Sequence, residues 1–598
     1  MKKRVADILV ETLVELGVVD CFSVVGGGAM HLNNAFRLND NISILYCHHE
    51  QACAFAAEGY AKYNGKMAAV CVTSGPGGMN TLNGVYSAWV DSTPMIIIAG
   101  HPRKDTTVPA CGLDIRCRGV QEFDIVPAVK GMTKYATMLL EPNDVKYEVQ
   151  KAVNIAMSGR RGPVWISVPL DVQAIQVEED DLRNYIPEHS LTVSREVIQT
   201  IVDKLNSAER PCILTGSAIR FTGATEQFLR LLEKIDIPVV GGALLSDTLP
   251  EGYQNFYGLS GSIGPRAGNY ILQNADLIFV LGNSLSTRQT GFAVEKFAPN
   301  ASFIMVDAEK DEPFKPGLHV DMPIHAEIND FLRAFNDHVF DPIKAKSGWK
   351  SYCEEVYSTF KDYDDVPFED GERVPAKLFW KKFRESMPDN ITLALGNSNG
   401  VIGIYQYGVK KMNQRVITNY NAGSMGYDLP EAVGIAIASK QDVICVTGDG
   451  SVMMNLQELQ TIKYNKLPIK LIVFSNKGYG AIRQTCKNFF NGVFAGCGPD
   501  SGVDIPSFEK IADTFDFKYY HCSTCGELDN SIQEFVNSTG NCILELEQKI
   551  DDPVTPKLMS KLREDGQFET PSLLDMFPCV DEEQDAKLRK FEDYIRKE

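Results

Sequence analysis

The sequence predicts an α/β protein of three domains, each built on a doubly wound parallel sheet, and three observations support this class. Short apolar runs alternate with helical segments through residues 1–175, as in parallel strands that are covered on both faces. Residues 443–480 follow the pattern strand, Gly-Asp-Gly turn, amphipathic helix, strand. Residues 70–73 and 444–447 have similar sequences, and each follows a small-residue helix and precedes a Gly-rich turn. The repeat predicts that the first and third domains share a fold.

Length and composition exclude several classes of protein. The chain has 598 residues and is 44% hydrophobic, enough for two to four domains with buried cores. No apolar run reaches the length of a membrane span, and the N-terminus reads as an amphipathic helix and not as a signal peptide. The net charge of −19 argues against nucleic acid or anionic membrane as a partner. The fifteen cysteines are scattered, which favours reduced core residues in a cytoplasmic protein.

The first domain, residues 1–176, alternates strands with helices. Its strands are predicted at residues 22–25, 42–47, 67–72 and 95–99. Gly-rich loops follow the first and third of these strands, at residues 26–29 and 73–78, and a helix rich in small residues starts at Glu50. In a doubly wound sheet such loops meet at the carboxyl edge, where ligands bind. We therefore expect a site at this edge.

The rest of the chain divides at two predicted linkers, an acidic stretch near residues 177–187 and a longer one at 343–372. They separate a central domain at residues 190–342 from a third domain at 373–555, which is followed by a tail at 556–598. The central strands are predicted at residues 212–215, 238–240, 277–281 and 303–306. The tail is expected to end in a charged helix.

The Gly448-Asp449-Gly450 turn predicts a phosphate site with a metal. A strand that feeds a glycine turn and a helix presents free backbone N–H groups to a phosphate, whereas the Asp449 carboxylate would repel one. A divalent cation between them removes the conflict, and Asn476 ends the next strand at the same edge. Oxygen ligands and a diphosphate suit Mg²⁺. An ordinary α/β turn is the alternative interpretation of these glycines alone.

The spacing from this turn to Asn476 resembles the diphosphate-binding motif of thiamine diphosphate enzymes. The resemblance implies that three groups hold the metal, namely Asp449, Asn476 and the backbone carbonyl of Gly478. It further implies that thiamine diphosphate contacts the residues of the turn and an apolar residue that props it in a bent shape. These positions are Gly448, Gly450, Ser451 and Met425.

The stretch HHEQACAFAAEGYAKYNGK, followed by VTSGPGGMN, resembles the pyrimidine-binding domain of the same enzymes. By itself, Glu50 at a helix start would be read as a favourable contact with the helix dipole. The resemblance implies instead that Glu50 hydrogen-bonds the aminopyrimidine ring and raises the basicity of the cofactor's own nitrogen. Ser74 and Gly75 are implied as further cofactor contacts.

Within these enzymes the sequence is most similar to the acetolactate synthase branch. The similarity rests on the loop at residues 26–29 and on Gln121-Glu122, which follow a loop that carries two arginines. In that branch the glycine loop and the glutamine lie beside the reacting carbon, which implies catalytic positions for Gly27 and Gln121. His31 is a candidate proton donor, with a helix-surface histidine as the alternative.

The central domain resembles the FAD-binding domain of acetolactate synthases. The matching residues are the glycines at 258–264, Arg288 and Asp307. Ser284 replaces a second arginine of that segment, and serine cannot make a bidentate or stacking contact. The resemblance implies bound FAD, although nucleotide-free relatives keep the same fold.

Together these resemblances imply an enzyme that uses thiamine diphosphate and Mg²⁺. It would decarboxylate a 2-oxo acid such as pyruvate and join the acyl unit to a carbonyl acceptor. Acetyl transfer to a nucleotide-linked keto-sugar in surface polysaccharide synthesis is an alternative, as is a simple decarboxylase that releases an aldehyde. A scaffold that lost the chemistry is disfavoured, because Glu50, Asp449 and Asn476 are all present. The family implies a homodimer or homotetramer with active sites at the subunit interface.

Overall fold

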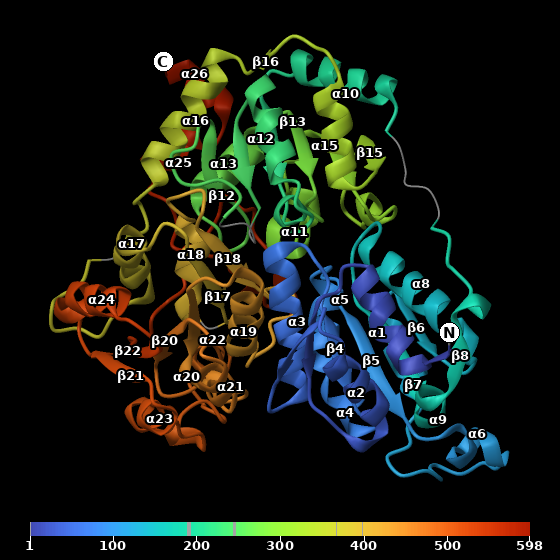
Figure 1. Ribbon diagram of the computed structural model, residues 1–598. Helices are drawn as coiled ribbons and strands as arrows, with labels where there is room; N and C mark the ends of the chain where they lie inside the picture. The colour runs from blue at the N-terminus through green and yellow to red at the C-terminus, as the bar shows by residue number, and fades with distance from the viewer. Residues whose placement is uncertain (1, 188–192, 243–246, 366, 398, 598) are drawn as a thin grey trace.

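The computed structural model of the protein describes residues 2–187, 193–242, 247–365, 367–397 and 399–597, and the domain boundaries predicted at residues 1, 190 and 598 lie outside them. Three α/β units, each with a six-stranded parallel sheet, make up the chain (Figure 1). This arrangement confirms the predicted fold class. Among the residues described, no helix is both long enough and apolar enough to cross a membrane.

The first and third sheets have the same topology. Their strand orders are β3-β2-β4-β5-β7-β6 and β18-β17-β19-β20-β22-β21, so each strand of one sheet has a counterpart in the other. This match confirms the shared fold that the sequence repeat predicts. The strands are β2 (Asp20–Ser23), β3 (Ser43–Tyr46), β4 (Ala69–Val72), β5 (Ile96–His101), β6 (Tyr135–Met138) and β7 (Val164–Pro169) in the first sheet, and β17 (Thr392–Leu395), β18 (Arg415–Thr418), β19 (Val443–Gly448), β20 (Ile469–Ser475), β21 (Lys518–Cys522) and β22 (Cys542–Glu547) in the third.

Helices cover both faces of these two sheets, as their buried strands require. Those of the first domain are α1 (Val5–Glu15), α2 (Met30–Leu38), α3 (Glu50–Asn64), α4 (Pro76–Asn80), α5 (Leu82–Val90), α6 (Val108–Cys111), α7 (Val126–Val129), α8 (Val145–Met157) and α9 (Leu170–Ala174). Those of the third are α17 (Ala376–Ser386), α18 (Ile402–Tyr407), α19 (Asp428–Ser439), α20 (Asp449–Val452), α21 (Glu458–Asn465), α22 (Gly480–Phe489), α23 (Phe508–Phe515) and α24 (Leu528–Asn537).

The central sheet has the order β12-β11-β9-β13-β14-β15, the order of dinucleotide-binding domains. Its strands are β9 (Pro211–Thr215), β11 (Val239–Gly241), β12 (Phe256–Leu259), β13 (Leu277–Leu281), β14 (Ser302–Asp307) and β15 (Met322–His325). Its helices are α10 (Arg195–Ser207), α11 (Ala218–Phe221), α12 (Thr225–Lys234), α13 (Arg266–Asn274), α14 (Thr287–Thr290) and α15 (Ile328–Asp337).

Both stretches expected as linkers contain secondary structure. In the first, β8 (Gln176–Glu178) pairs antiparallel with β1 (Lys2–Arg4). In the second, β16 (Ile343–Lys344) pairs with β10 (Ile235–Asp236), and α16 (Ser347–Phe360) packs on α13. Two aromatic residues of α16, Trp349 and Tyr352, are buried there. The second stretch therefore extends the central domain up to the end of α16.

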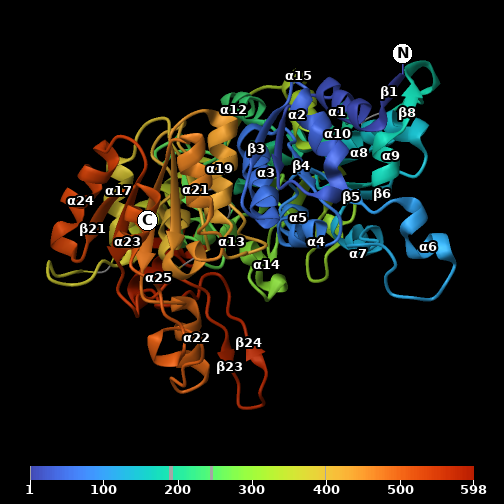
Figure 2. The same cartoon turned by 60° about the horizontal axis from the view of Figure 1, so that its bottom comes forward.

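The tail also packs on the central domain. Tyr352 Oη donates to the Leu588 carbonyl at 2.8 Å, and Tyr270 Oη donates to Asp585 at 2.6 Å. The tail ends in α25 (Glu582–Leu588) and α26 (Phe591–Lys597), as expected, whereas its hairpin β23 (Lys561–Leu562) and β24 (Phe568–Glu569) projects beside α22 (Figure 2).

Helices α3 and α19 occupy equivalent positions in their domains and pack against each other (Figure 1). A Cβ on Gly59 would lie 2.5 Å from the Glu431 carbonyl oxygen, and one on Gly434 would lie 1.8 Å from that of Ala56. Only glycine allows this approach of the two backbones, because any side chain there would collide with a carbonyl group. One apolar core runs through both domains across this contact.

The predicted helix after the Gly-Asp-Gly turn is interrupted. Instead of one amphipathic helix there are two short ones, α20 and α21, separated by residues 453–457. The apolar residues Val452, Leu459 and Ile462 are buried as their spacing predicts. The interruption turns Asn455 away from a helical course and toward the first domain, where it contacts Gln51.

Candidate active site

In both outer domains the predicted site residues lie at the carboxyl ends of the strands beside the point where the strand order reverses. Ligands of open α/β sheets bind at such switch points. In the first domain the loops after β2 and β4 pack together, since Thr73 Oγ1 accepts a hydrogen bond from the Gly28 N–H at 3.0 Å. A Cβ on Gly28 would lie 2.4 Å from Ser74 Oγ, whereas Gly27 is exposed and faces open space. Gly27 is thus the glycine of this run that is open to a ligand.

Glu50 begins α3 and is half-buried at this edge. Its Oε2 accepts a hydrogen bond from Asn80 Nδ2 at 3.0 Å. His49 caps the helix, because its Nδ1 accepts the Gln51 N–H at 3.0 Å. The bond from Asn80 uses only part of the acceptor capacity of the Glu50 carboxylate, which leaves the rest for a ligand.

Gln121 lies against the same loops. Its backbone has φ = +57°, a conformation that is uncommon for a non-glycine residue and that clusters at functional sites. A Cβ on Gly75 would lie 2.6 Å from the Gln121 carbonyl oxygen, and the Gln121 side chain lies 3.5 Å from Ser74 Oγ. His31 lies one residue into α2 and makes no side-chain hydrogen bond to the residues described.

The Gln121 loop depends on a residue that sequence reasoning did not assign a role. The Glu122 carboxylate accepts the backbone N–H groups of Val108, Arg118 and Gly119 at 2.5, 2.8 and 2.8 Å. These bonds depress the pKa of Glu122, against the opposing effect of burial. The carboxylate thus closes the loop that presents Gln121.

In the third domain Asp449 and Asn476 come together as predicted. Asp449 Oδ2 accepts the N–H groups of Asn476, Lys477 and Gly478 at 3.0, 2.7 and 3.2 Å. Its other oxygen, Oδ1, and Asn476 Oδ1 are buried and have no hydrogen-bond partner among the residues described. Unpaired buried oxygens are costly, and a hard cation would satisfy both. Burial raises the pKa of Asp449 to about 6, while the three N–H groups oppose this shift.

The segment that carries Met425 is tied to the Gly-Asp-Gly turn through Ser451. Ser451 Oγ accepts the Gly426 N–H at 2.9 Å and donates to Asp428 Oδ2 at 2.8 Å. The Ser451 hydroxyl is therefore used inside the protein, which leaves its backbone N–H for a diphosphate. Asp428, which is buried and also accepts from Thr447 Oγ1 at 2.8 Å, is a further residue that sequence reasoning missed.

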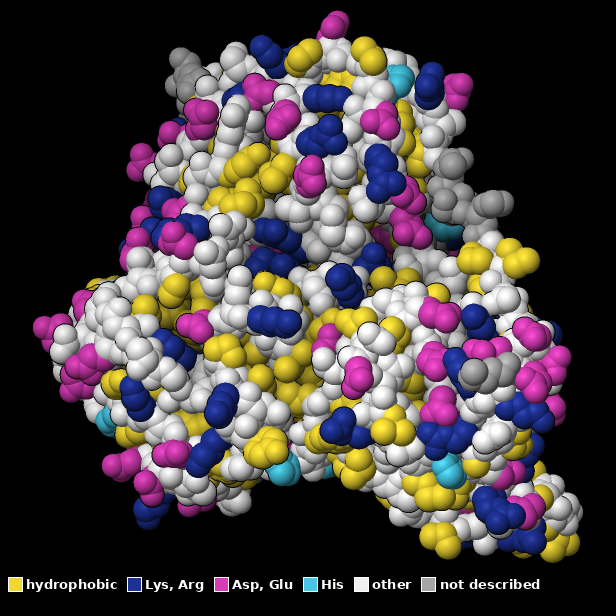
Figure 3. All heavy atoms as spheres, viewed as in Figure 1, with side chains coloured by type: hydrophobic (Ala, Val, Ile, Leu, Met, Phe, Trp, Pro, Cys, Tyr) yellow, Lys and Arg dark blue, Asp and Glu magenta, His cyan; other side chains and the backbone are white. Residues whose placement is uncertain are grey.

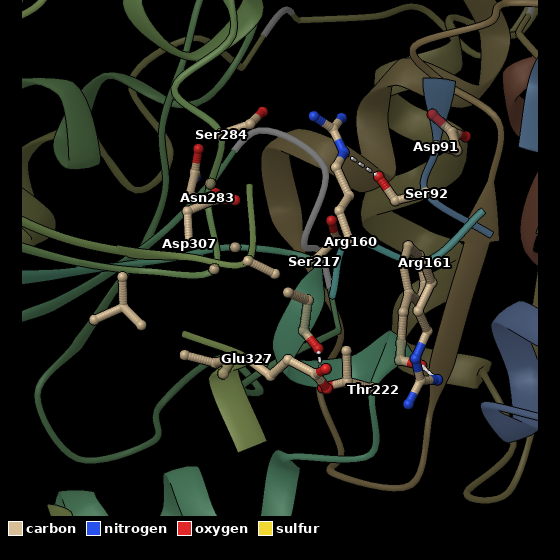
Figure 4. A pocket seen from close by; sticks show the side chains of 18 of the residues that line it. Asp91, Ser92, Arg160, Arg161, Ser217, Thr222, Asn283, Ser284, Asp307 and Glu327 are labelled. Atoms are coloured by element: carbon tan, nitrogen blue, oxygen red, sulfur yellow. Dashed lines mark hydrogen bonds between the residues drawn. The ribbon is translucent and has the colours of Figure 1, made fainter. Parts of the chain in front are cut away.

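A pocket opens at the switch point of the central sheet, between β9 and β13 (Figure 4). A Cβ on Gly216 would lie 1.7 Å from the Gly282 carbonyl oxygen, so the floor is bare backbone. Asp307 lies on one wall, and burial raises its pKa to about 6. Arg160, whose Nε donates to Ser92 Oγ at 2.8 Å, comes from the first domain. All three domains contribute to the lining, the third through Asn421.

Arg288, the other predicted FAD contact, lies elsewhere. It is exposed, its guanidinium stacks 4.5 Å from the ring centre of Tyr420, and it does not line this pocket. The loop at residues 258–264 contacts it, because Ser262 N–H donates to the Arg288 carbonyl at 2.7 Å. The predicted FAD residues are therefore divided between two places.

Comparison with known proteins identifies the class. Models of the thiamine pyrophosphate enzyme family match residues 3–126 (N-terminal TPP binding domain), 198–335 (central domain) and 394–546 (C-terminal TPP binding domain). Each match falls on one of the three units, and the chain belongs to the thiamine pyrophosphate-dependent enzymes.

Individual relatives identify the branch of this enzyme family that the chain resembles. The large subunit of acetolactate synthase isozyme 2 from Escherichia coli (strain K12) is 28% identical over 545 residues, which cover 90% of this chain and 95% of the relative. That of Lactococcus lactis subsp. lactis (strain IL1403) is 29% identical over 523 residues, covering 86% and 87%. Acetolactate synthase 1 of Zea mays is 27% identical over 570 residues, covering 93% and 87%. The protein is an acetolactate synthase-like enzyme.

Proposed function

We propose that this enzyme decarboxylates pyruvate or a close 2-oxo acid and joins the acyl unit to a carbonyl acceptor, with thiamine diphosphate and Mg²⁺ as cofactors. The observation that carries the proposal is the pair of buried, unpartnered oxygens on Asp449 and Asn476 at the edge of the third sheet. The relatives, which are acetolactate synthases, agree with it. When bound, thiamine diphosphate supplies a carbon nucleophile and an electron sink for loss of CO₂.

Side chains of the protein itself would bind the metal, activate the cofactor and orient the substrate. Asp449, Asn476 and the Gly478 carbonyl would hold Mg²⁺, which neutralises the diphosphate. Glu50 would hydrogen-bond the aminopyrimidine ring and raise the basicity of the cofactor's own nitrogen, at a site separate from the metal. Gln121 would orient the substrate beside Gly27, and Met425 would fix the shape of the cofactor.

Product analysis tests this function. The enzyme, loaded with thiamine diphosphate and Mg²⁺, would be incubated with ¹³C-labelled pyruvate, alone and with a panel of aldehydes, 2-oxo acids and nucleotide-linked keto-sugars. We expect labelled CO₂ and a new C–C bond in the NMR spectrum. Acetaldehyde as the sole product would identify a simple decarboxylase, and a product formed with keto-sugars alone would identify that alternative. The names of the relatives favour a 2-oxo acid acceptor over both alternatives.

We also propose that the central pocket binds FAD. Asp307 suits ribose hydroxyls, and Gly216 and Gly282, whose backbones pack closely together, line the pocket with backbone groups that suit a diphosphate. Arg160 would supply a positive charge from the neighbouring domain. Arg288 remains a predicted contact for another part of the nucleotide, outside the pocket lining.

The purified protein is therefore expected to be yellow and to release flavin when denatured. Asp307→Ala should lower the flavin content several-fold, because a half-buried acceptor for the nucleotide is lost. Asp311→Ala, four residues away and exposed, serves as the matched control. Absorbance at flavin wavelengths per protein measures both variants. A colourless protein that gains no flavin on incubation with FAD would refute the assignment.

The active unit is proposed to be at least a dimer, in which one cofactor lies between the first domain of one subunit and the third domain of another. Helix α22, which closely follows residues 476–478, and the β23–β24 hairpin project side by side from the rest of the chain (Figure 2). Many apolar side chains of the first domain, the third domain and the hairpin are exposed, as expected for a subunit interface. They include Val25, Met30, Met79, Val120, Phe123, Met454, Ile482, Phe489, Phe490 and Phe568.

Apolar side chains also gather low in the centre of Figure 3, where the first and third domains meet. A dimer formed through these exposed apolar side chains would bury them and bring the half-sites of a second subunit against those of the first.

All fifteen cysteines are free thiols, which supports a cytoplasmic location.

A further inference from the structure

Asn455 lies in the interruption between α20 and α21, and it contacts both half-sites of the chain. Its side chain is completely buried. Its Nδ2 donates to the Gly426 carbonyl at 2.6 Å and to Gln51 Oε1 at 3.1 Å. Gly426 follows Met425, and Gln51 follows Glu50. The two hydrogens of one amide group thus reach the neighbours of two predicted cofactor contacts.

The amide of Asn455 is held in one orientation. Its Oδ1 accepts from Gln457 Nε2 at 3.2 Å, so every part of the group is bonded. A buried amide with all its bonds made rigidifies its surroundings, whereas a missing partner would cost free energy.

Gly426 is constrained from both sides of its backbone. Its N–H is bonded to Ser451 Oγ and its carbonyl to Asn455. Its φ of +74° and the 2.7 Å between a Cβ placed there and the Met454 Cβ both require glycine. The orientation of Met425 therefore depends on bonds made by the adjacent peptide.

Gln51 supplies the link to the other half-site. It lies in the first turn of α3. A second hydrogen bond joins the same two domains close by, from the His48 N–H to Glu458 Oε1 at 3.1 Å. The Asp449, Asn476 and Gly478 cluster makes its own backbone bonds and does not include Asn455.

We propose that Asn455 is a positioning residue that holds the start of α3 and the Met425 segment in one fixed relation. The inference rests on the proposed function: in the proposed dimer Glu50 and Met425 of one chain contact two different cofactors, so the bridge fixes one half-site of each cofactor relative to the other. Loss of the bridge should impair turnover while it leaves metal and diphosphate binding almost unchanged. Displacement of catalytic groups by about 1 Å can cost about 10²-fold in rate.

Two substitutions that nearly keep the size of the side chain test the two hydrogen bonds of Asn455 separately. Gln51→Met removes the acceptor in the first domain and keeps the bond to Gly426. Asn455→Leu removes both donations. We expect kcat to fall about tenfold in the first variant and about a hundredfold in the second, with the cofactor Kd changed less than threefold. Asn465→Leu, on the exposed side of α21, is the control.

The double variant gives the decisive result. Because Gln51 acts through Asn455, Gln51→Met should have no further effect in the Asn455→Leu background, so the double variant should match Asn455→Leu alone. Effects that multiply, or a Gln51→Met enzyme with wild-type kcat, would overturn the proposal.

Hydrogen exchange of the apoprotein gives a readout that does not need activity. Residues 47–53 should exchange faster in both variants, and residues 421–428 only in Asn455→Leu. Equal protection of both segments in all variants would also overturn the bridge. If wild-type protein releases no CO₂ from pyruvate, the proposed function fails, and the exchange pattern still decides whether Asn455 joins the half-sites.

Discussion

Replacement of Glu50 by Gln is expected to reduce turnover with pyruvate by about 10²–10⁴-fold, the usual contribution of a general acid–base group. Glutamine keeps the size of the side chain and can still accept from Asn80 Nδ2, the partner of Glu50 Oε2. It removes the negative charge that would stabilise a proton shift on the cofactor. Stopped assays of CO₂ release, at saturating cofactor, measure the effect.

The same variant should bind thiamine diphosphate and Mg²⁺ with an affinity close to that of the wild type, because the proposed metal ligands lie in the other domain. Glu15→Gln, at the exposed end of α1, is the matched control and should retain full activity. Near-normal turnover by a Glu50→Gln enzyme that has been shown to bind cofactor would remove Glu50 from the mechanism.

Asp449→Ala is expected to lower the affinity for thiamine diphosphate and Mg²⁺, and this loss should be its largest effect. Even partners outside the ligand shell of a metal typically contribute 10–100-fold to its affinity, so a direct ligand should contribute at least about a hundredfold. The substitution also leaves the N–H groups of residues 476–478 without their acceptor. The loop that carries Asn476 and Gly478 would therefore lose order as well as charge.

Calorimetric titration of the apoprotein with thiamine diphosphate and Mg²⁺ measures this loss. Asp442→Ala is a suitable control, since Asp442 is exposed and precedes the same strand at its opposite end. An unchanged affinity in Asp449→Ala would place the metal elsewhere.

The strands and the contact of Asp449 with the end of the next strand could be predicted because their signals are local. Buried parallel strands are continuous apolar runs. The predicted run at residues 277–281 coincides with β13, and the strand expected at the start of residues 443–480 is β19. Site residues at the ends of adjacent strands follow from topology, since parallel strands end at a common edge. The contact of Asp449 with residues 476–478 is of this kind.

The rest depends on tertiary packing. The apolar residues of α20 and α21 keep the spacing of a single helix, so the break between the two helices has no signal in that pattern. At the break, Asn455 bonds to Gly426 and Gln51, which are distant in sequence. The burial of Trp349 and Tyr352 in α16 arises from contact with the tail, which lies far away in sequence. The position of Arg288 on Tyr420 is likewise set by another domain.

Mixing Glu50→Gln and Asp449→Ala subunits tests the central claim that one cofactor lies between the first domain of one subunit and the third domain of another. In a hybrid dimer one site would carry both defects and the other neither. With equal amounts and full exchange, half of the dimers are hybrids with one intact site, so about a quarter of wild-type activity should return. No recovery after exchange has been verified by mass spectrometry, or an active species that sediments as a monomer, would contradict the account.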